Sequence, residues 1–522
     1  MKNRTLLAVT LSFLVLISWQ AFVGKPYHID DKGVMASRPQ QEIKAKDQEM
    51  PLATPSASTP SPSIQQDYTP LGELETDKLK VEFVNPGARI QKIFLKDYNL
   101  DSYITEALFL KLFSDKPYTL QKSADKLIFN YQENGHSIIK TINFRNNSYY
   151  IELEVVYENI TPDNWTLNDR LIIGQISSKI KPEIGQLFDV AFLNQETKHK
   201  SPLSVKGKYV HFQPISGLGL RDRYSCLIIG TEDLPSAKAV IEKNNALAEA
   251  GFDLDNIVVA PSSQVSYKSN IYIGPQDARY LKEEPTGFED IIHYGSFDFI
   301  SVILLSVLRF FYNVSHNWGL ALILLTSFVF FALYPLTLKQ MRSMKHMQEL
   351  QPQIELLRKA HKDNPQRLNK EIMELYRRNK ANPLGGCLPI ILQIPIFFGL
   401  YQALSRSIVL KGARFLWIKD LAEPDRLFML ENPLPFIGKE VNLLPILMTI
   451  ATFFQQKLSS KTTTATSASA EQQKMMAVIF PVMMLALFYH FPSGLALYWF
   501  LSTLLNVLLQ WKTLKSTATK TN

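Results

Sequence analysis

Residues 382–401, NPLGGCLPIILQIPIFFGLY, combine turn residues at their start with an apolar run that two prolines and one glutamine interrupt. Pro389 and Pro395 each remove a backbone N–H group and crowd the preceding turn, so such a pair is rare in a helix of a soluble core. In a membrane span, neighbouring helices can satisfy the freed carbonyl groups. Gln393 is costly in lipid unless it faces protein or a water-filled cavity. The stretch predicts a membrane helix with a role beyond spanning, and a kinked structural helix with one satisfied glutamine is the alternative.

Length and composition place this helix in a chain with more than one folded unit. The chain has 522 residues, which is too long for a single core. Its overall composition, 46% hydrophobic and 20% charged residues, is the average of an apolar membrane part and a polar part. Cys226 and Cys387 fall in segments expected at different depths, so no disulfide is predicted. The sequence has no Gly-x-Gly-x-x-Gly motif, no Walker-type loop and no zinc-like Cys/His spacing. We therefore expect no nucleotide site, no other cofactor and no metal.

The first 23 residues predict a transmembrane signal anchor. Lys2 and Arg4 precede an apolar run at 6–23 that is about long enough to cross a bilayer. A cleaved signal peptide is the alternative, but the run ends without an Ala-x-Ala-like site. We expect an uncleaved anchor with a cytoplasmic N-terminus. Residues 24–72 are rich in Pro, Ser, Thr and Gln, which predicts a disordered linker on the outer side.

Residues 73–290 predict an all-β domain outside the cytoplasm, most simply one β-sandwich. Residues 151–157, IELEVVY, alternate apolar and charged side chains as a half-buried strand does. Asn134-Gly135 separates two apolar runs, 126–132 and 137–144, and is a strong hairpin signal. One helix is expected at 236–250, after Pro235. Further strand-like runs are 79–84, 170–174, 257–265, which Pro261 interrupts, and 269–273.

Two apolar segments follow the β-domain. Residues 297–312 are apolar with Arg309 near their end, and the polar residues 313–317 interrupt the run. We expect an amphipathic helix along the outer membrane–water interface, and a span is the alternative. Residues 318–338 predict the second span, with Tyr334-Pro335 near its inner end.

Residues 339–384 predict a cytoplasmic helical hairpin. Residues 339–381 hold eleven Lys and Arg against five Asp and Glu, which places them inside by the positive-inside rule. Much of the net charge of +8 lies here, so no specific nucleic-acid partner is expected. A solvated charged surface explains most of these charges, and partner binding is an additional hypothesis. The expected coiled-coil seam consists of Met347, Leu350, Ile354 and Leu357, a break at 362–365, and then Leu368, Ile372 and Leu375.

The rest of the chain predicts four further spans, giving six in total with both termini in the cytoplasm. Residues 441–454 are short enough for a re-entrant segment, but a full crossing keeps the C-terminal lysines inside. Residues 459–470 are of low complexity and predict a flexible loop. The expected segments are a span at 386–405, an outer loop at 407–440, a span at 441–456, a cytoplasmic loop at 457–474, spans at 475–491 and 493–511, and a tail at 512–522.

Uncharged polar residues are the candidate functional groups of the membrane part. No predicted span carries Asp, Glu, Lys or Arg near its middle, which argues against an ion-driven pump. Thr326 and Tyr334 share one helix face, and Tyr498, Ser502 and Asn506 repeat every four residues on another. With Gln393 we expect them to line a polar groove, and hydrogen bonds that hold helices together are the alternative. The other polar residues of the span interiors are Ser327, Thr449, Thr452 and Thr503.

Three motifs of this part resemble those of the YidC family of membrane-protein insertases: the opening stretch at 382–401, YPLT at 334–337 and FPSGLALY at 491–498. The order of anchor, large outer β-domain and five core spans with a hairpin is also similar, and LGLRDRY at 218–224 is a looser match. The resemblance implies a bacterial inner-membrane protein of the Gram-negative type. It also implies a periplasmic supersandwich like that of galactose mutarotase, without sugar chemistry, and a groove open to cytoplasm and lipid. Phe330 stands where family members usually carry an arginine that attracts acidic substrate segments.

The resemblance further implies an insertase and chaperone that is no enzyme and has no catalytic residues. The implied partners are nascent membrane proteins, the phospholipid bilayer, the Sec translocon, and the ribosome or SRP pathway at the hairpin. Substrate helices would leave between spans three and five, where Pro389, Pro395 and Pro481 form bendable exit walls, and a short fourth span would thin the bilayer. A polytopic transporter and an envelope assembly scaffold acting through the β-domain are the alternatives. A carbohydrate enzyme has the weakest support, because the β-region shows no convincing acid/base pair.

Overall fold

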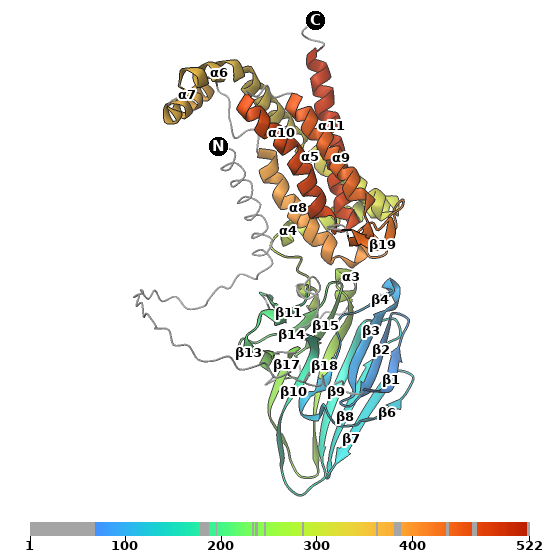
Figure 1. Cartoon of the computed structure of the whole chain (residues 1–522). Coiled ribbons are helices and arrows are strands. Elements are labelled where there is room, and N and C mark those ends of the chain that lie inside the picture. The colour runs from blue at the N-terminus through green and yellow to red at the C-terminus, as the bar shows by residue number, and fades with distance from the viewer. Residues whose placement is uncertain are drawn as a thin grey trace, which may run out of the picture. The chain divides into compact units, whose positions relative to one another are not determined.

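The structure, a computed structural model, consists of two compact units (Figure 1). The first unit extends to Lys96 and continues at Asp101–Gly274, and the second comprises Asp97–Leu100 and the chain from Pro275 onward. The structure describes residues 68–177, 187–194, 196–231, 234, 238–244, 247–283, 287–361, 364–379, 388–434, 438–461 and 467–518. The predicted anchor at 1–23 and the predicted linker up to residue 67 lie outside the described residues. So do residues 380–384 of the predicted hairpin and residues 386–387 of the span predicted at 386–405.

Antiparallel sheets build the first unit. Their strand orders are β1-β2-β3-β4, β13-β16-β17-β10-β5 and β12-β11-β14-β15-β18-β9-β8-β7-β6. The first strand begins at Thr69, so the β-domain starts a few residues before the predicted boundary at 73. The strands are β1 (Thr69–Glu75), β2 (Leu79–Asn85), β3 (Arg89–Leu95), β4 (Leu100–Asp101), β5 (Phe109–Leu110), β6 (Thr119–Lys122), β7 (Lys126–Glu133), β8 (His136–Phe144), β9 (Tyr150–Asn159), β10 (Trp165–Ser177), β11 (Asp189–Leu193), β12 (Lys198–Lys200), β13 (Gly207–His211), β14 (Gly217–Arg221), β15 (Ser225–Gly230), β16 (Lys238–Lys243), β17 (Leu247–Val259) and β18 (Ser263–Pro275).

The predicted hairpin at Asn134-Gly135 is confirmed. Both residues have positive φ angles, 50° and 79°, and Glu133 of β7 pairs with His136 of β8 across the two-residue turn. Positive φ at both central positions suits the right-handed twist of the strands, and Asn and Gly adopt it at little steric cost. The predicted alternation in 151–157 is also confirmed, because buried and half-buried residues alternate along β9.

The helix predicted at 236–250 is wrong. Residues 238–243 form β16 and residues 247–259 form β17, which pair with each other and, through β17, with β10. Ala, Glu and Lys favour a helix locally, but Val240, Ile241 and Phe252 gain full burial as strand residues, and tertiary packing overrides the weak local preference. The run at 257–265 is likewise no single strand, since Pro261 lies in the turn between β17 and β18.

Helices dominate the second unit (Figure 1). Pro335, Pro395 and Pro481 lie inside helices, and α9 and α10 extend into the segment predicted to be a flexible loop at 459–470. Residues 428–441 add a small hairpin. The elements are α3 (Ala278–Leu281), α4 (Asp298–Ser315), α5 (Trp318–Glu349), α6 (Gln351–Ala360), α7 (Pro365–Arg378), α8 (Leu388–Arg406), β19 (Phe428–Leu434), β20 (Gly438–Val441), α9 (Leu443–Lys461), α10 (Ser467–Phe488) and α11 (Ser493–Ala518).

Three helical stretches of the described residues are long and apolar enough to cross a membrane: Asp298–Ser315, Trp318–Ser343 and Ser493–Lys512. Leu443–Leu458 and Val478–Phe488 are shorter apolar helices. The membrane helical part of the predicted fold therefore agrees with the structure, whereas the number of six spans stays a prediction. The first of the three stretches is α4, for which an interfacial position was expected, and length alone does not distinguish the two placements.

Candidate functional site

Gln393 of α8 and Tyr498 of α11 form a hydrogen bond between two helices. Gln393 Nε2 donates to Tyr498 Oη over 2.9 Å, and the tyrosine side chain is only 1% exposed. Ser502 lies one turn further along α11, close enough to interact with the same hydroxyl group. A buried tyrosine hydroxyl group needs a polar partner. Three of the predicted groove residues are therefore brought together, and we call Gln393, Tyr498 and Ser502 the polar cluster.

Most of the other predicted polar residues bond to their own helices. Thr326 is buried, and its Oγ1 donates to the carbonyl oxygen of Leu322 over 2.7 Å. Asn506 Nδ2 donates to the carbonyl oxygen of Ser502 over 2.8 Å. These side chains keep acceptor capacity, but at least one of their donors is already used. The same bond to the residue four positions earlier is made by Ser327, Thr449 and Thr452.

Tyr334 and Phe330 form an aromatic surface on α5. Their ring centroids are 6.3 Å apart, and the ring of Phe331 lies 5.7 Å from that of Phe330. Phe330 is half-buried. Among the described residues, Tyr334 forms no hydrogen bond with the polar cluster. The position where an arginine was expected from the resemblance thus presents an uncharged ring.

The three prolines of the predicted exit walls have different positions in their helices. Pro395 lies inside α8, and Pro481 lies inside α10 and is buried. Pro389 is the second residue of α8. The residues before Leu388 lie outside the described part of the chain. That Pro389, Pro395 and Pro481 form bendable exit walls therefore stays a prediction.

An aromatic cluster joins α8, α10 and α11 beyond these prolines. Phe397 of α8 lies 5.6 Å from Phe488 of α10 and 5.3 Å from Trp499 of α11, measured between ring centroids. Phe488 and Trp499 are 5.2 Å apart. Such contacts are worth about 0.5–1.5 kcal/mol each beyond their burial. They hold the two predicted exit walls together at this level.

The described residues of 407–440, a segment predicted only as an outer loop, fold with Val441 and Asn442 into a cap on the ends of α9 and α11. The backbone N–H groups of Ser493 and Gly494 donate to the carbonyl oxygens of Glu423 and Leu421 over 2.8 and 2.9 Å. Asp425 is buried, and its Oδ2 accepts from the N–H group of Leu444 over 2.9 Å. These bonds satisfy helix N-termini that would otherwise lack partners. Sequence reasoning missed the cap, although Asn442, directly before the apolar run of α9, is of a residue type that favours the start of a helix.

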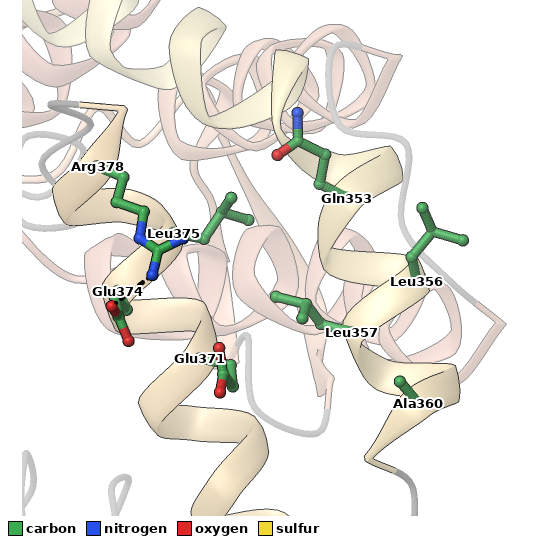
Figure 2. Close-up of a pocket in the computed structure, with 8 residues that line it drawn as sticks. All are labelled: Gln353, Leu356, Leu357, Ala360, Glu371, Glu374, Leu375 and Arg378. Atoms are coloured by element: carbon green, nitrogen blue, oxygen red, sulfur yellow. Dashed lines mark hydrogen bonds and ion pairs between the residues drawn. The ribbon is translucent and has the colours of Figure 1, made fainter.

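The hairpin of α6 and α7 contains a hollow of about 330 Å³ (Figure 2). Leu357 of α6 and Leu375 of α7 face each other across it, and Arg378 pairs with Glu374 over 2.7 Å at its edge. Leu356 is largely exposed. The predicted seam is confirmed in part, because Leu350 and Ile354 are buried and contact Ile372, Leu375 and Tyr376. The side chain of Met347 lies outside the described residues.

Comparison with known proteins connects both units to one class of membrane protein. The YidC periplasmic domain model matches residues 112–307, and the 60Kd inner membrane protein model matches residues 310–520. The membrane protein insertase YidC of Pelobacter propionicus is 32% identical, with 97% of this chain and 98% of the relative covered. That of Endomicrobium trichonymphae is 30% identical, with 99% of each chain covered. The chain therefore belongs to the YidC family of membrane protein insertases.

Solved structures add two more distant similarities. A crystal structure of an active YidC insertase with its first transmembrane domain resolved is 18% identical, covers 84% of this chain and 92% of that chain, and gives a TM-score of 0.39. A galactose mutarotase related enzyme from Lactobacillus acidophilus is 10% identical, covers 39% of this chain and 96% of that chain, and gives a TM-score of 0.30. At these scores the family assignment rests on the sequence relatives alone.

Proposed function

We propose that this insertase guides hydrophilic segments of nascent inner-membrane proteins partway through the bilayer along the polar cluster and releases their apolar helices into lipid. The observation that supports the proposal is the hydrogen bond from Gln393 to Tyr498 between otherwise apolar helices. A polar group moved into hydrocarbon without a hydrogen bond costs roughly 2–7 kcal/mol. An amide and two hydroxyl groups that exchange partners with the passing segment lower that barrier. The step makes and breaks no covalent bond, so no catalytic residue is needed.

The release path in this proposal runs between α8 and α10. Phe397 and Phe488 close the space between these helices at the level of the aromatic cluster. Pro395 and Pro481 precede those rings in the chain, so the two helices are easiest to bend on the cytoplasmic side of the cluster. Thr326 and Asn506 have acceptor oxygens that a passing segment can use. A substrate helix would leave through this part.

The proposed topology has six spans, cytoplasmic termini and a periplasmic supersandwich domain, with α4 lying along the outer interface. Arg309 of α4 pairs with buried Asp277 over 3.4 Å, and Asp277 also pairs with Arg279 over 2.7 Å. Asp277 belongs to the connection just after β18. A spanning α4 would draw this charged group into hydrocarbon, which is strongly unfavourable. The pair therefore favours the interfacial position.

The proposed partners at the hairpin are the ribosome or SRP pathway, and the insertase works alone or with the Sec translocon. The exposed positive charges of α6 and α7 suit an RNA-rich or acidic surface as a steering patch. The hollow beside Leu357 and the exposed Leu356 offer an apolar contact next to these charges. This proposal rests on charge and exposure and does not require a defined pocket ligand.

The insertion step is tested with the double variant Gln393→Leu and Ser502→Leu in reconstituted vesicles. Loss of both polar partners should slow insertion of a single-span substrate about tenfold, equivalent to ~1.4 kcal/mol in the barrier. The measurement is protease protection of the substrate's outer segment over time. Thr452→Val is the matched control, because Thr452 is buried on α9 and, among the described residues, its hydroxyl group bonds only to its own helix. Unchanged insertion by the double variant would rule out the polar path.

The partner proposal is tested by reversing three exposed charges of the hairpin, Lys359→Glu, Lys370→Glu and Arg377→Glu. Binding of ribosomes that carry a stalled membrane-protein chain should weaken about tenfold, because steering charges act on association. Co-sedimentation with the full chain in detergent measures it. The control variant carries Lys359→Arg and Lys370→Arg, which keep the charge. Equal binding by both variants would leave only a solvated surface.

A further inference from the structure

Two edge strands meet at one margin of the β unit. Within the described residues, β12 pairs only with β11 at the end of the nine-stranded sheet, and β13 pairs only with β16 at the end of the five-stranded sheet. Lys200 Nζ of β12 lies 3.5 Å from the ring centroid of Tyr209 on β13. The ring of Phe192 on β11 lies 5.8 Å from that of Tyr209. Figure 1 shows β11 and β13 at the same margin. The side chains thus hold β12 beside β13, whose outer edge pairs with no strand in the part of the chain that the structure describes.

This margin carries excess positive charge. Residues 196–212 contain Lys198, Lys200, Lys206 and Lys208 against the single carboxylate of Glu196. Lys208 pairs with Asp253 over 2.9 Å. The other three lysines form no ion pair with any residue that the structure describes. Burial lowers the pKa of Lys200, whose ammonium group faces an aromatic ring and lacks a carboxylate.

Protection against aggregation is the simplest alternative role for these lysines. Natural sheets often place lysine on edge strands to prevent pairing with other chains. The edge strand β6 lies at the other end of the nine-stranded sheet. Its Lys122 is engaged within the chain, since Nζ donates to the carbonyl oxygen of Glu73 over 3.0 Å. The margin of β12 and β13 differs, because Phe212 directly follows β13 and is 85% exposed. A protective edge has no need of an exposed phenylalanine.

We propose that the margin formed by β12, β13 and Phe212 binds an extended acidic segment of a partner protein by strand addition. The backbone of the segment pairs with an open strand edge, which provides affinity without regard to sequence. Alternate side chains of a strand point to one face. Carboxylates at alternate positions therefore reach Lys198, Lys200 and Lys206, while an apolar residue packs on Phe212. This function is independent of the polar cluster in the membrane helices.

The test is binding of a labelled eight-residue peptide that alternates Glu and Val to the full chain in detergent micelles, followed by fluorescence anisotropy. The same peptide with Gln in place of Glu should bind at least tenfold more weakly. The variant Lys198→Glu, Lys200→Glu and Lys206→Glu should lose binding by a similar factor. Lys122→Glu with Lys126→Glu, at the opposite end of the sheet, is the matched control and should leave binding unchanged.

A second experiment separates strand addition from simple charge attraction. Two further peptides are N-methylated at alternate amides, one along each backbone edge of the extended peptide. Methylation removes the N–H donors of that edge without changing the charge, so only one of the two peptides loses the edge that pairs with the protein. One of the two methylated peptides should lose at least tenfold in affinity, and the other should retain it. Equal binding of both, or no difference between the Glu and Gln peptides, would overturn the proposal. The proposal would also be overturned if the peptide did not bind while the protein bound vesicles of anionic phospholipid through the three lysines.

Discussion

The β unit and the membrane helices bury polar side chains in different ways. The β unit buries charged groups with charged or backbone partners: fully buried Arg221 pairs with Asp189 over 2.6 Å, and Lys140 Nζ donates to the carbonyl oxygens of Ala88 and Leu108. In the described parts of the membrane helices, the buried polar groups are neutral, such as Thr326, Thr452 and Tyr498. A buried charge is tolerable where a rigid sheet fixes its partners. Under the proposed release path, helices that open to lipid would keep only groups that are inexpensive to unpair.

Arg221→Met should have the largest effect and tests the charged side of this comparison. Removing the guanidinium group leaves Asp189 buried without its closest cation, so the free energy of unfolding of the β unit should fall by about 3–5 kcal/mol. Hydrogen exchange of β11 and β14 in the full chain measures the change. Thr452→Val, the corresponding change on α9, should alter stability by less than about 1 kcal/mol.

The double variant Arg221→Met with Asp189→Leu is the control for this prediction. Replacing a buried ion pair by apolar residues of similar volume is often neutral. The double variant should therefore recover much of the stability that Arg221→Met loses. If Arg221→Met costs no more than Thr452→Val, the contrast between the β unit and the membrane helices does not hold.

A pH titration tests the second buried charge. Burial lowers the pKa of Lys140 to about 7 from its ordinary value of 10.5. Between these values the unfolded chain binds a proton that the folded chain does not, so the stability of the β unit rises with pH. Between pH 7 and pH 9 the gain should be about 2 kcal/mol at 1.36 kcal/mol per pH unit.

The comparison of wild type with Lys140→Met isolates this contribution. Hydrogen exchange, corrected for the pH dependence of its chemical rate, measures the stability of both proteins at pH 7 and pH 9. The difference in stability between them should change by the predicted amount in favour of the wild type at pH 9. A difference that stays constant with pH would show that Lys140 keeps the same charge in folded and unfolded chains.

Local signals in the sequence predicted individual turns and strands better than the pairing of segments that lie far apart in the chain. Asn134-Gly135 fixed a hairpin correctly, because two adjacent residues determine that turn. The helix predicted at 236–250 was wrong, because these residues form strands whose pairing, of β17 with β10, depends on residues about 80 positions earlier in the chain. Gln393 and Tyr498 were both recognised as site candidates, yet their contact joins residues 105 positions apart, which no local pattern encodes.

The cap on α9 and α11 shows the same limit for the second unit. Its hydrogen bonds connect Glu423 and Leu421 to the start of α11, some 70 residues later. The composition of the segment, with five basic and five acidic residues in 407–440, predicted only an exposed loop. Buried residues such as Leu421 and Asp425 are recognisable only from the packing. Balanced charge in a loop is therefore compatible with a folded cap.

Phe330→Arg should have the smallest effect and tests whether neutrality of the membrane helices selects substrates. The ring of Phe330 lies beside Tyr334, so an arginine here would add a cation next to an otherwise uncharged aromatic surface. In a hydrated groove, attraction between opposite charges about 4 Å apart is worth ~1 kcal/mol. Insertion of a substrate with an acidic outer segment should become about fivefold faster in vesicles, while a neutral segment should gain nothing. Phe330→Leu is the control for loss of the ring, and acceleration of both substrates by Phe330→Arg would mean that charge at this position does not determine which segments are accepted.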